Sequence, residues 1–290
     1  MPNLPKSTWI AGCGYVGRPL AESLCREGVE VLALTRTETS AQALQEQVPF
    51  PVRACDLSSR LAVCELADSL GIPEAIVHCA SSGHGGIDRY RTVYLDGCIN
   101  LLSACPESRL LFTSSTSVYA QTGGESVTED SPAQPLQETG KILRDAEDQV
   151  LRKSGIVARL SGIYGPGRCI HLQRFLDGTA VIESGTSRFL NQIHRDDIVT
   201  AVILLLRLRQ TTAGQVYNVS DGDHLTQRSC YEALAQFFQR PLPPEGPSDS
   251  DKKRGWTHKR VDSSKLRALG WEPKYPSLLD ALRLDPGLRE

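Results

Sequence analysis

The sequence predicts an α/β protein built on a doubly wound parallel sheet, with a smaller lobe toward its C-terminus. Three features of the 290-residue chain lead to this prediction. Short apolar runs alternate with helical patterns through the first half, as in βαβ units. A glycine-rich turn, GCGYVG at residues 12–17, follows the first apolar run directly. The regular alternation stops after residue 168.

Composition and charge narrow the class of protein. With 40% hydrophobic and 23% charged residues, the chain resembles an ordinary globular protein. A formal net charge of −2 gives no electrostatic reason to expect a nucleic acid or an anionic membrane as partner. No apolar run approaches the ~20 residues of a membrane span, and the N-terminus lacks the apolar core of a signal peptide. A cytoplasmic location is therefore expected.

The cysteines and histidines predict no metal site. The nine cysteines contain no C-x-x-C pair, and the six histidines have no zinc-ligand spacing. Free thiols in a reducing compartment are the expected state.

Strands and helices are expected in regular succession. The run at 29–36 is nearly all apolar, which is typical of a strand covered on both faces. From Val16, Leu20 and Leu24 share one helical face, and Gly28 is a plausible stop. Strands are predicted at 8–12, 29–36, 51–56, 74–80, 109–115 and 155–161. Further helices are predicted at about 59–70, 88–104, 137–153 and 196–209.

The chain is expected to divide into two parts. Residues 1–167 and about 196–221 form the sheet domain, and about 168–195 and 222–290 form the lobe, whose role would be to bind substrate. The helix at 196–209 returns the chain to the sheet domain. The segment 240–255 is rich in proline, serine and charge, so it is expected to be an exposed loop.

The motif at 12–17 has the spacing G-x-G-x-x-G between a strand and a helix. Gly12 permits a tight turn, Gly14 allows a pyrophosphate to approach the backbone, and Gly17 allows close packing of helix on strand. The amide groups at the helix N-terminus then face the anion. This predicts a dinucleotide site; a glycine turn without a ligand is the alternative.

The end of the second strand favours NADP over NAD. An NAD site usually places Asp or Glu here, where it accepts a hydrogen bond from the ribose 2′-hydroxyl. The sequence has Thr35 and then Arg36, a cation that could pair with a 2′-phosphate. NAD remains the alternative cofactor, and Arg36 could instead be a solvated surface residue.

Seven segments in order resemble the extended short-chain dehydrogenase/reductase family, which includes the nucleotide-sugar epimerases and dehydratases. The most specific is LLFTSSTSVYA at 110–120, which is similar to the family signature S-S-x-x-V-Y-G. The others are ACDL (54–57), VHCAS (77–81), RLSGIYGPG (159–167), IHRDDIV (193–199), YNVSDG (217–222) and DSSKLRALGWEP (262–273). The resemblance runs nearly from end to end. Ala11 stands at the first glycine of the usual G-x-x-G-x-x-G, and together with the replaced catalytic residues described below this departure makes the chain similar to the family's atypical branch.

The resemblance implies a Rossmann fold, a small-molecule substrate such as a nucleotide sugar, and a homodimer formed through helices 88–104 and 137–153. It also implies a set of cofactor contacts along the carboxyl ends of the strands. These are Gly12, Gly14, Tyr15, Val16, Gly17, Arg36, Asp56, Leu57, Cys79, Ala80 and Ser81.

The catalytic residues of the family are only partly present. Ser115 matches the serine that hydrogen-bonds the substrate oxygen. The family's Tyr-x-x-x-Lys pair, in which the lysine lowers the tyrosine pKa, is replaced by Thr139 and Leu143. Lys141 lies roughly 200° around the helix from Thr139 and should not substitute. Tyr94 stands where the family has an asparagine.

Two functions are compatible with this pattern. In the first, the protein is an oxidoreductase or epimerase/dehydratase in which Ser115 acts with a different proton donor. Tyr94, Tyr119, His194 or a group on the substrate are candidates, and each side chain could instead be a packing residue; Tyr94, on a helix expected to face the cofactor, is preferred. In the second, the protein is a sensor or scaffold that binds NADP without turnover, because the binding motifs survive better than the catalytic ones.

Overall fold

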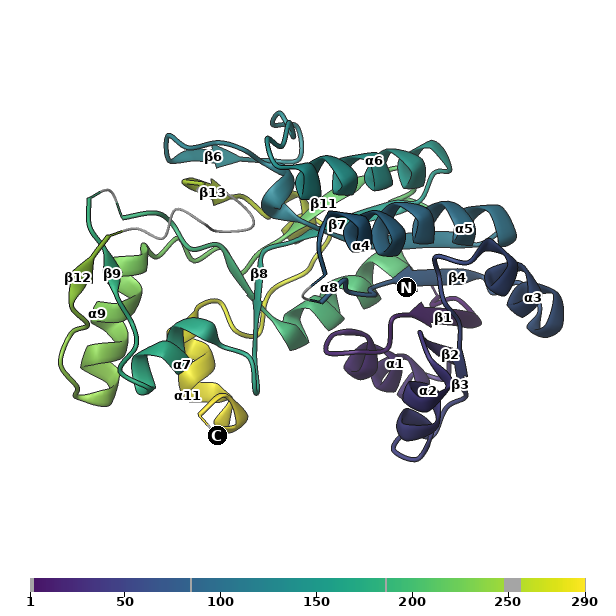
Figure 1. The fold of residues 1–290 in the computed structure, drawn as a ribbon, viewed down its shortest axis with the longest axis horizontal. Helices are drawn as coiled ribbons and strands as arrows, with labels where there is room; N and C mark the ends of the chain where they lie inside the picture. The colour runs from purple at the N-terminus through teal and green to yellow at the C-terminus, as the bar shows by residue number, and fades with distance from the viewer. Residues whose placement is uncertain (1–2, 84, 186, 248–256, 290) are drawn as a thin grey trace.

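The centre of the molecule is a seven-stranded parallel sheet with strand order β11-β7-β5-β4-β1-β2-β3. The computed structural model describes residues 3–83, 85–185, 187–247 and 257–289. The order reverses at β1, so the chain winds outward in both directions and helices cover both faces of the sheet (Figure 1). The prediction of a doubly wound α/β fold is confirmed.

The strands carry short apolar stretches that are buried on both sides. Ile10 in β1 is fully buried and lies in register with Ala33 of β2 on one side and Val77 of β4 on the other. The bounds are β1 Ser7–Ala11, β2 Glu30–Thr35, β3 Val52–Ala54, β4 Ala75–His78, β5 Arg109–Ser115, β7 Ile156–Leu160 and β11 Val216–Val219. Strand β11 was not among the predicted strands; it is four residues long and contains the buried polar Asn218.

Two helical layers enclose the sheet (Figure 1). Helices α1 (Gly17–Arg26) and α8 (Arg195–Arg207) contact each other on one face. On the other face α3 (Arg60–Leu70) contacts α5 (Gly97–Ala104), which contacts α6 (Glu138–Arg152). Each layer has its own apolar cluster against the sheet. Helix α2 (Glu38–Gln45) was not predicted, although Thr37 caps it by accepting a hydrogen bond from the Ser40 amide.

The helix expected at 88–104 is not regular. It consists of α4 (Ile87–Tyr90), a π-helical segment η1 (Arg91–Asp96) and α5. The Nε2 of His78, buried beneath it, donates to the Val93 carbonyl oxygen at 2.9 Å. π-Helical turns are rare and often occur at functional sites, and this one carries Tyr94.

Some of the smaller elements form an apolar cluster of their own, and others pack against the sheet. A third apolar cluster unites α7 (Ile170–Leu176), α9 (Gln227–Phe238) and α11 (Leu278–Leu284). By contrast, Leu266 in α10 (Ser264–Arg267) and Trp271 pack into the cluster on the α1 face of the sheet. The remaining elements are η2 Thr116–Val118, β6 Glu125–Val127, β8 Gly162–Tyr164, β9 Ile182–Glu183, β10 Gln192–His194, β12 Glu245–Gly246, β13 Lys259–Val261 and η3 Pro286–Leu288.

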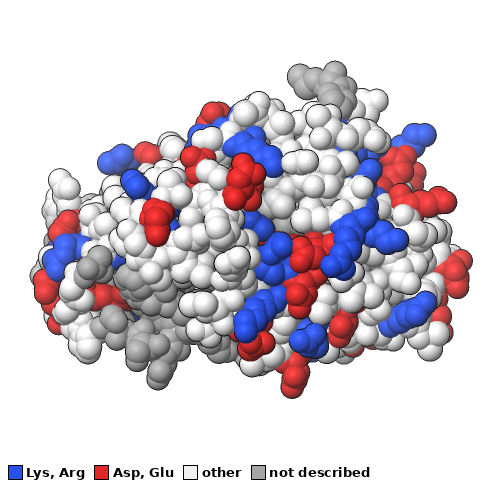
Figure 2. Space-filling view, turned by 90° about the horizontal axis from the view of Figure 1, so that it is seen from above, with Lys and Arg blue, Asp and Glu red and all other residues white. Residues whose placement is uncertain are grey.

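The surface carries charges of both signs. On the face in Figure 2, blue and red side chains are interspersed rather than separated into large fields. Within the described residues, no helix is long and apolar enough to cross a membrane. Of the loop predicted at 240–255, residues 240–247 are described and contain β12, and residues 248–256 lie outside the described part.

Candidate functional site

Two adjoining cavities follow the carboxyl ends of the central strands. The larger, about 430 Å³, is lined by the turn after β1 and by the ends of β4, β5 and β7; we call it the glycine cavity. The smaller, about 270 Å³, contains Asp56 and is called the Asp56 cavity. They share six residues: Gly12, Thr35, Arg36, Ser40, Ala80 and Ser81. The two therefore form one elongated trough at the point where the strand order reverses, which is where ligands bind in open α/β sheets.

The three glycines of the turn have different structural reasons to be glycine. Gly12 has φ +103°, and a Cβ there would lie 2.3 Å from the backbone nitrogen of Ala80. A Cβ on Gly17 would lie 2.2 Å from the Gly12 carbonyl oxygen, so this residue serves packing and is not among the residues lining either cavity. A Cβ on Gly14 would meet nothing within 4 Å. Gly14 lines the glycine cavity, so its missing side chain leaves room for a ligand rather than for the protein.

This difference predicts opposite results for two alanine substitutions. Gly14→Ala should leave the free energy of unfolding unchanged or raise it by up to about 1 kcal/mol, while weakening dinucleotide binding. Gly12→Ala should cost roughly 1–3 kcal/mol of stability, because the methyl group would press on the Ala80 backbone. Urea unfolding and calorimetric titration with NADP measure both effects. Equal losses of stability in the two variants would contradict this distinction.

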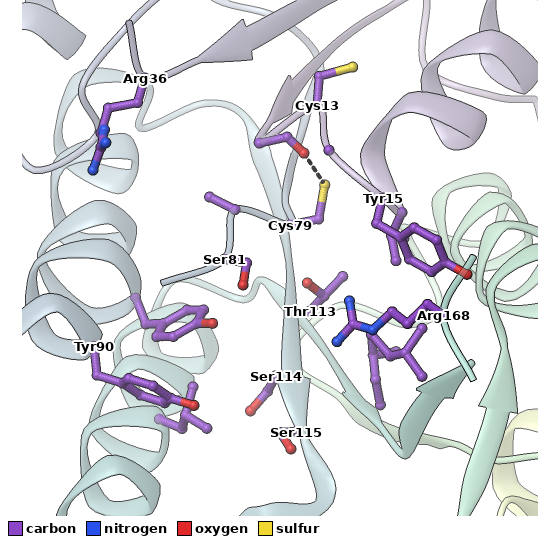
Figure 3. A pocket seen from close by; sticks show the side chains of 18 of the residues that line it. Cys13, Tyr15, Arg36, Cys79, Ser81, Tyr90, Thr113, Ser114, Ser115 and Arg168 are labelled. Atoms are coloured by element: carbon purple, nitrogen blue, oxygen red, sulfur yellow. Dashed lines mark hydrogen bonds between the residues drawn. The ribbon is translucent and has the colours of Figure 1, made fainter. Parts of the chain in front are cut away.

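Tyr15 and Val16, which follow Gly14 in the turn, also line the glycine cavity. The Tyr15 hydroxyl donates to the Pro166 carbonyl oxygen at 3.1 Å. The guanidinium carbons of Arg168 and Arg195 each lie 5.3 Å from the centre of the Tyr15 ring. Burial raises the pKa of the Tyr15 hydroxyl, so it stays protonated near neutral pH. Tyr15 thus joins the glycine turn to the YGPGR segment, and Arg168 also lines the cavity (Figure 3).

The far end of the trough carries a charged side chain, that of Arg36. Arg36 lines both cavities, and it has neither an ion pair nor a hydrogen bond to any other described residue. Figure 3 places it at the opposite end of the cavity from Ser115. Asp56 and Leu57 line the Asp56 cavity, and Asp56 Oδ1 accepts hydrogen bonds from the Ser58 amide at 3.0 Å and its hydroxyl at 2.7 Å. Cys79, Ala80 and Ser81 line the glycine cavity directly beside the turn, where Cys79 Sγ donates to the Gly12 carbonyl oxygen at 3.2 Å.

Three hydroxyl residues in succession end strand β5 (Figure 3). Thr113 donates to the His78 carbonyl oxygen at 3.1 Å, and Ser114 donates to Glu147 Oε1 at 2.6 Å. Ser115 Oγ accepts from the Ser117 amide at 3.2 Å, and no acceptor for its own proton is found among the described residues. Ser115 is therefore the one hydroxyl of the three that can still donate to a bound molecule.

Tyr94 lines the glycine cavity from the π-helical segment, next to Tyr90. Its hydroxyl accepts from the Ser82 amide at 3.3 Å, and its ring lies 5.0 Å from that of Tyr90 and 6.2 Å from that of Phe112. Burial lowers the pKa of His78 to about 4, so the imidazole that fixes this segment is neutral at physiological pH. Tyr90 also lines the cavity and was not predicted, although it precedes Tyr94 by one helical turn.

Of the two positions where the family has the Tyr-x-x-x-Lys pair, one holds an apolar side chain in this chain and the other does not line the glycine cavity. Leu143 is 4% exposed and lines the glycine cavity, so an apolar side chain occupies the predicted lysine position. Thr139 is not among the residues lining the cavity. Lys141 points elsewhere, because its ammonium group pairs with Glu138 on the exposed side of α6.

Two proton-donor candidates from the sequence are buried in structural networks. Tyr119 is fully buried; it donates to Asn218 Oδ1 at 2.9 Å and accepts from Arg159 Nη1 at 2.8 Å. His194 is also fully buried, and its Nε2 lies 3.2 Å from Asp285 Oδ2. Burial raises the pKa of Tyr119 and lowers that of His194. Neither lines the cavities described here, so neither is positioned as the proton donor.

A third cavity, of about 670 Å³, lies between the sheet domain and the lobe. It shares Ser115 and Ile163 with the glycine cavity, so the two meet at the end of β5. We call it the Lys259 cavity, after the lysine on its wall. On the side of the lobe it is lined by residues that include His171, Arg174 and Arg188. None of these three belongs to a motif identified from the sequence.

The described residues contain no cluster of His, Cys, Asp or Glu side chains that could hold a metal ion. All nine cysteines are free thiols. Burial raises the pKa of Cys13 to about 12 and that of Cys79 further, so the two thiols on the glycine cavity are protonated and poorly nucleophilic.

Comparison with known proteins agrees with this geometry. Protein YeeZ of Escherichia coli K12 is 29% identical over 285 residues, covering 94% of this chain and 98% of the relative. A structure from Methylobacillus flagellatus that is named as an NAD-dependent epimerase/dehydratase superposes on this chain with a TM-score of 0.80. The two are 27% identical, and the match covers 99% of this chain and 100% of the other. MoeE5, solved with UDP-glucose and NAD, has the same fold, with a TM-score of 0.77, 21% identity and 98% coverage of both chains.

The sequence model of one family covers most of the sheet domain. It is the model of the NAD dependent epimerase/dehydratase family, and it matches residues 9–220. The matched region includes the glycine turn, the end of β5, helix α6 and strand β11. This chain belongs to the NAD dependent epimerase/dehydratase family.

Proposed function

We propose that the protein is an NAD(P)-binding oxidoreductase of the nucleotide-sugar epimerase/dehydratase type, with NADP as the preferred cofactor and an active site that lacks the Tyr-x-x-x-Lys pair. The observation that carries this proposal is the position of Ser115. Its hydroxyl stands where the glycine cavity meets the Lys259 cavity, and it retains a proton to donate. A cofactor in one cavity and a substrate in the other would meet at this residue.

The residues of the trough fit a dinucleotide phosphate. Gly14 leaves open space for a pyrophosphate beside the N-terminus of α1. Arg36 supplies a cation that has no partner among the described residues, and the position before it, Thr35, lacks the carboxylate that would repel a 2′-phosphate. The other proposed contacts are Tyr15, Val16, Gly17, Asp56, Leu57, Cys79, Ala80 and Ser81; Gly17 acts by packing α1 against the turn.

The cofactor preference gives the direct test of this function. We expect NADP to bind more tightly than NAD, and Arg36→Ala to weaken NADP binding about 10- to 100-fold, because a charge-assisted hydrogen bond contributes about 1.5–3 kcal/mol. NAD binding should change little. Isothermal titration calorimetry measures both, with Arg26→Ala, an exposed arginine of α1 outside the trough, as the control. Equal affinities for the two cofactors in the unaltered protein would refute the preference.

Ser115 and Tyr94 are the proposed catalytic residues. When bound, the nicotinamide supplies the hydride acceptor or donor of the family's chemistry. The Ser115 hydroxyl would donate to the substrate oxygen and stabilise charge that develops there. Tyr94 lies on the same cavity and would take the role of the missing tyrosine as proton donor or acceptor.

The substrate is proposed to be a small molecule of the nucleotide-sugar class. MoeE5, which shares the fold, was solved with UDP-glucose and with UDP-glucuronic acid. We take about 168–195 and 222–290 as the lobe that binds the substrate, and 1–167 with about 196–221 as the dinucleotide-binding domain. The third apolar cluster, built mainly from these two lobe segments, supports the division.

We also propose a cytoplasmic homodimer paired through α5 and α6. Ile99 on α5 and Leu136 just before α6 are exposed apolar residues, and the free thiols suit a reducing compartment. A monomer in light scattering at high micromolar concentration would count against the dimer.

A second candidate function is an NADP-binding sensor or scaffold without turnover. The observation that favours it is Leu143, an apolar side chain on the glycine cavity where the family uses a lysine. Turnover assays on the unaltered protein and on the Thr139→Tyr, Leu143→Lys variant distinguish the enzyme from the sensor or scaffold.

A further inference from the structure

Lys259 occupies an unusual place for a lysine. It begins β13, whose residues alternate in burial: Lys259 and Val261 face inward, and Arg260 between them is exposed. The outer edge of the strand is held by Asn191, whose side-chain amide donates to the Lys259 carbonyl oxygen at 2.9 Å and accepts from the Val261 amide at 2.7 Å. A strand position that would normally hold an apolar residue therefore holds an amine.

The amine of Lys259 is buried with no countercharge from the part of the chain that the structure describes. Lys259 is only 4% exposed, and among the described residues its ammonium group has no carboxylate partner. Among the described residues its one hydrogen bond goes to the Tyr119 carbonyl oxygen at 2.9 Å, so two of its three N–H groups have no partner there. Burial lowers the pKa of Lys259 to about 8. Burying a charge without a partner lowers the stability of the folded protein. Lys259 is therefore destabilising unless another group pairs with its ammonium group.

The surroundings of Lys259 are those of an anion site. It lines the Lys259 cavity together with Ser115 and Ser117 from the end of β5, and Arg174 and Arg188 line the same cavity from the lobe. No aspartate or glutamate is among the described residues lining it. Glu183 lies behind Arg188, 3.4 Å from its Nε, and so offsets that arginine but not Lys259.

We propose that Lys259 binds an anionic group of the substrate, a carboxylate or a phosphate, on the inner wall of the cavity beside Ser115. The anion supplies the countercharge that the described residues do not provide, and Arg174 and Arg188 add to the attraction. Lys259 thereby selects a charged substrate over a neutral one of the same shape. The inference rests on the proposed function only in taking this cavity as the substrate site.

Two substitutions separate the charge of Lys259 from its structural hydrogen bond. Lys259→Gln keeps a neutral N–H donor for the Tyr119 carbonyl oxygen, and Lys259→Met removes the donor and keeps the apolar stem. Lys153→Gln is the matched control, since Lys153 is an exposed lysine at the end of α6 and lines none of the three cavities. Both Lys259 variants should unfold at the same temperature as the unaltered protein or higher, because they bury no unpaired charge.

Calorimetry with UDP-glucuronic acid, UDP-glucose, UDP and uridine tests the proposal and identifies the anion. If Lys259 binds a carboxylate, the protein prefers UDP-glucuronic acid to UDP-glucose by about tenfold or more, and both variants lose this preference. If it binds a phosphate, the two sugars bind alike, and both variants weaken both sugars and UDP by a similar factor without affecting uridine.

The proposal is overturned if both variants bind every probe within about twofold of the unaltered protein, or if the unaltered protein binds none of the anionic probes at millimolar concentration. A loss in Lys259→Met alone, with Lys259→Gln unchanged, would also overturn it, since that assigns a structural role to the hydrogen bond. NADP binding serves as the separate readout for the proposed function. Lys259 does not line the trough, so its variants should bind NADP normally, and a protein that binds the anions but not NADP would refute the proposed function alone.

Discussion

Ser115→Ala is expected to lower kcat by about 10²–10³-fold, the effect of removing one oriented donor to a developing oxyanion. The reason is that Ser115 alone among the three hydroxyls ending β5 has a proton not already donated within the described protein. The assay follows the conversion of UDP-glucuronic acid and of UDP-glucose to product in the presence of NADP, together with NADPH formation, because an epimerase or dehydratase returns the hydride and leaves no net NADPH. Ser69→Ala, on the exposed side of α3, is the control, because Ser69 lies outside the three cavities.

The same assay assigns the proton donor. Tyr94→Phe removes one oxygen and leaves the ring in contact with Tyr90 and Phe112, so a large loss of rate with normal NADP binding identifies Tyr94 as the stand-in acid. If the unaltered protein turns over and Ser115→Ala leaves the rate unchanged, the assignment of the catalytic site is wrong.

Restoring the family pair with Thr139→Tyr and Leu143→Lys is expected to raise the rate by about 10²–10⁴-fold, the usual contribution of a positioned general acid. The two positions are four residues apart on α6 and so share one face of the helix, and Leu143 already lines the glycine cavity. Leu143 is nearly buried, so the new lysine costs stability unless the cofactor is bound. Thr139→Ala is the matched control and should change little, because a threonine hydroxyl is no practical acid near neutral pH.

The outcome of the double substitution also separates the two candidate functions. If the restored protein turns over and the unaltered protein is inactive on every substrate tested, the sensor or scaffold function is favoured. If both turn over and Tyr94→Phe abolishes only the activity of the unaltered protein, the non-standard active site is supported.

Much of the sheet domain could be predicted because its signals are local. The strand at 109–115 was predicted with the bounds that the structure gives, and six of the seven strands follow from apolar runs. The π-helical segment could not be predicted, since the local pattern does not distinguish it from an α-helix and its contact with His78 of β4, which donates to the Val93 carbonyl oxygen, is distant in sequence. Strand β11 was missed because four residues with a polar one among them give too weak a periodicity.

The candidate site divides in the same way. Residues in contiguous motifs, such as Gly14 and Ser115, lie on the cavities as the sequence suggested. Tyr119 and His194 have the right chemistry, but their burial and partners depend on contacts with residues as distant as Asn218 and Asp285. Lys259 carries no sequence signal at all. Its place on the cavity follows from the fold, because β13 turns its side chain inward and the end of β5 lines the same cavity.

A crystal structure with NADP bound tests the central claim most directly. We expect the 2′-phosphate of NADP to bind Arg36 and its pyrophosphate to lie against Gly14. The nicotinamide should lie beside Ser115, at the junction with the Lys259 cavity. We also expect Tyr94 to be the nearest protonatable side chain, within about 3–4 Å of the reacting region around the nicotinamide C4. A nicotinamide bound away from Ser115, or another protonatable side chain in the place proposed for Tyr94, would contradict this claim.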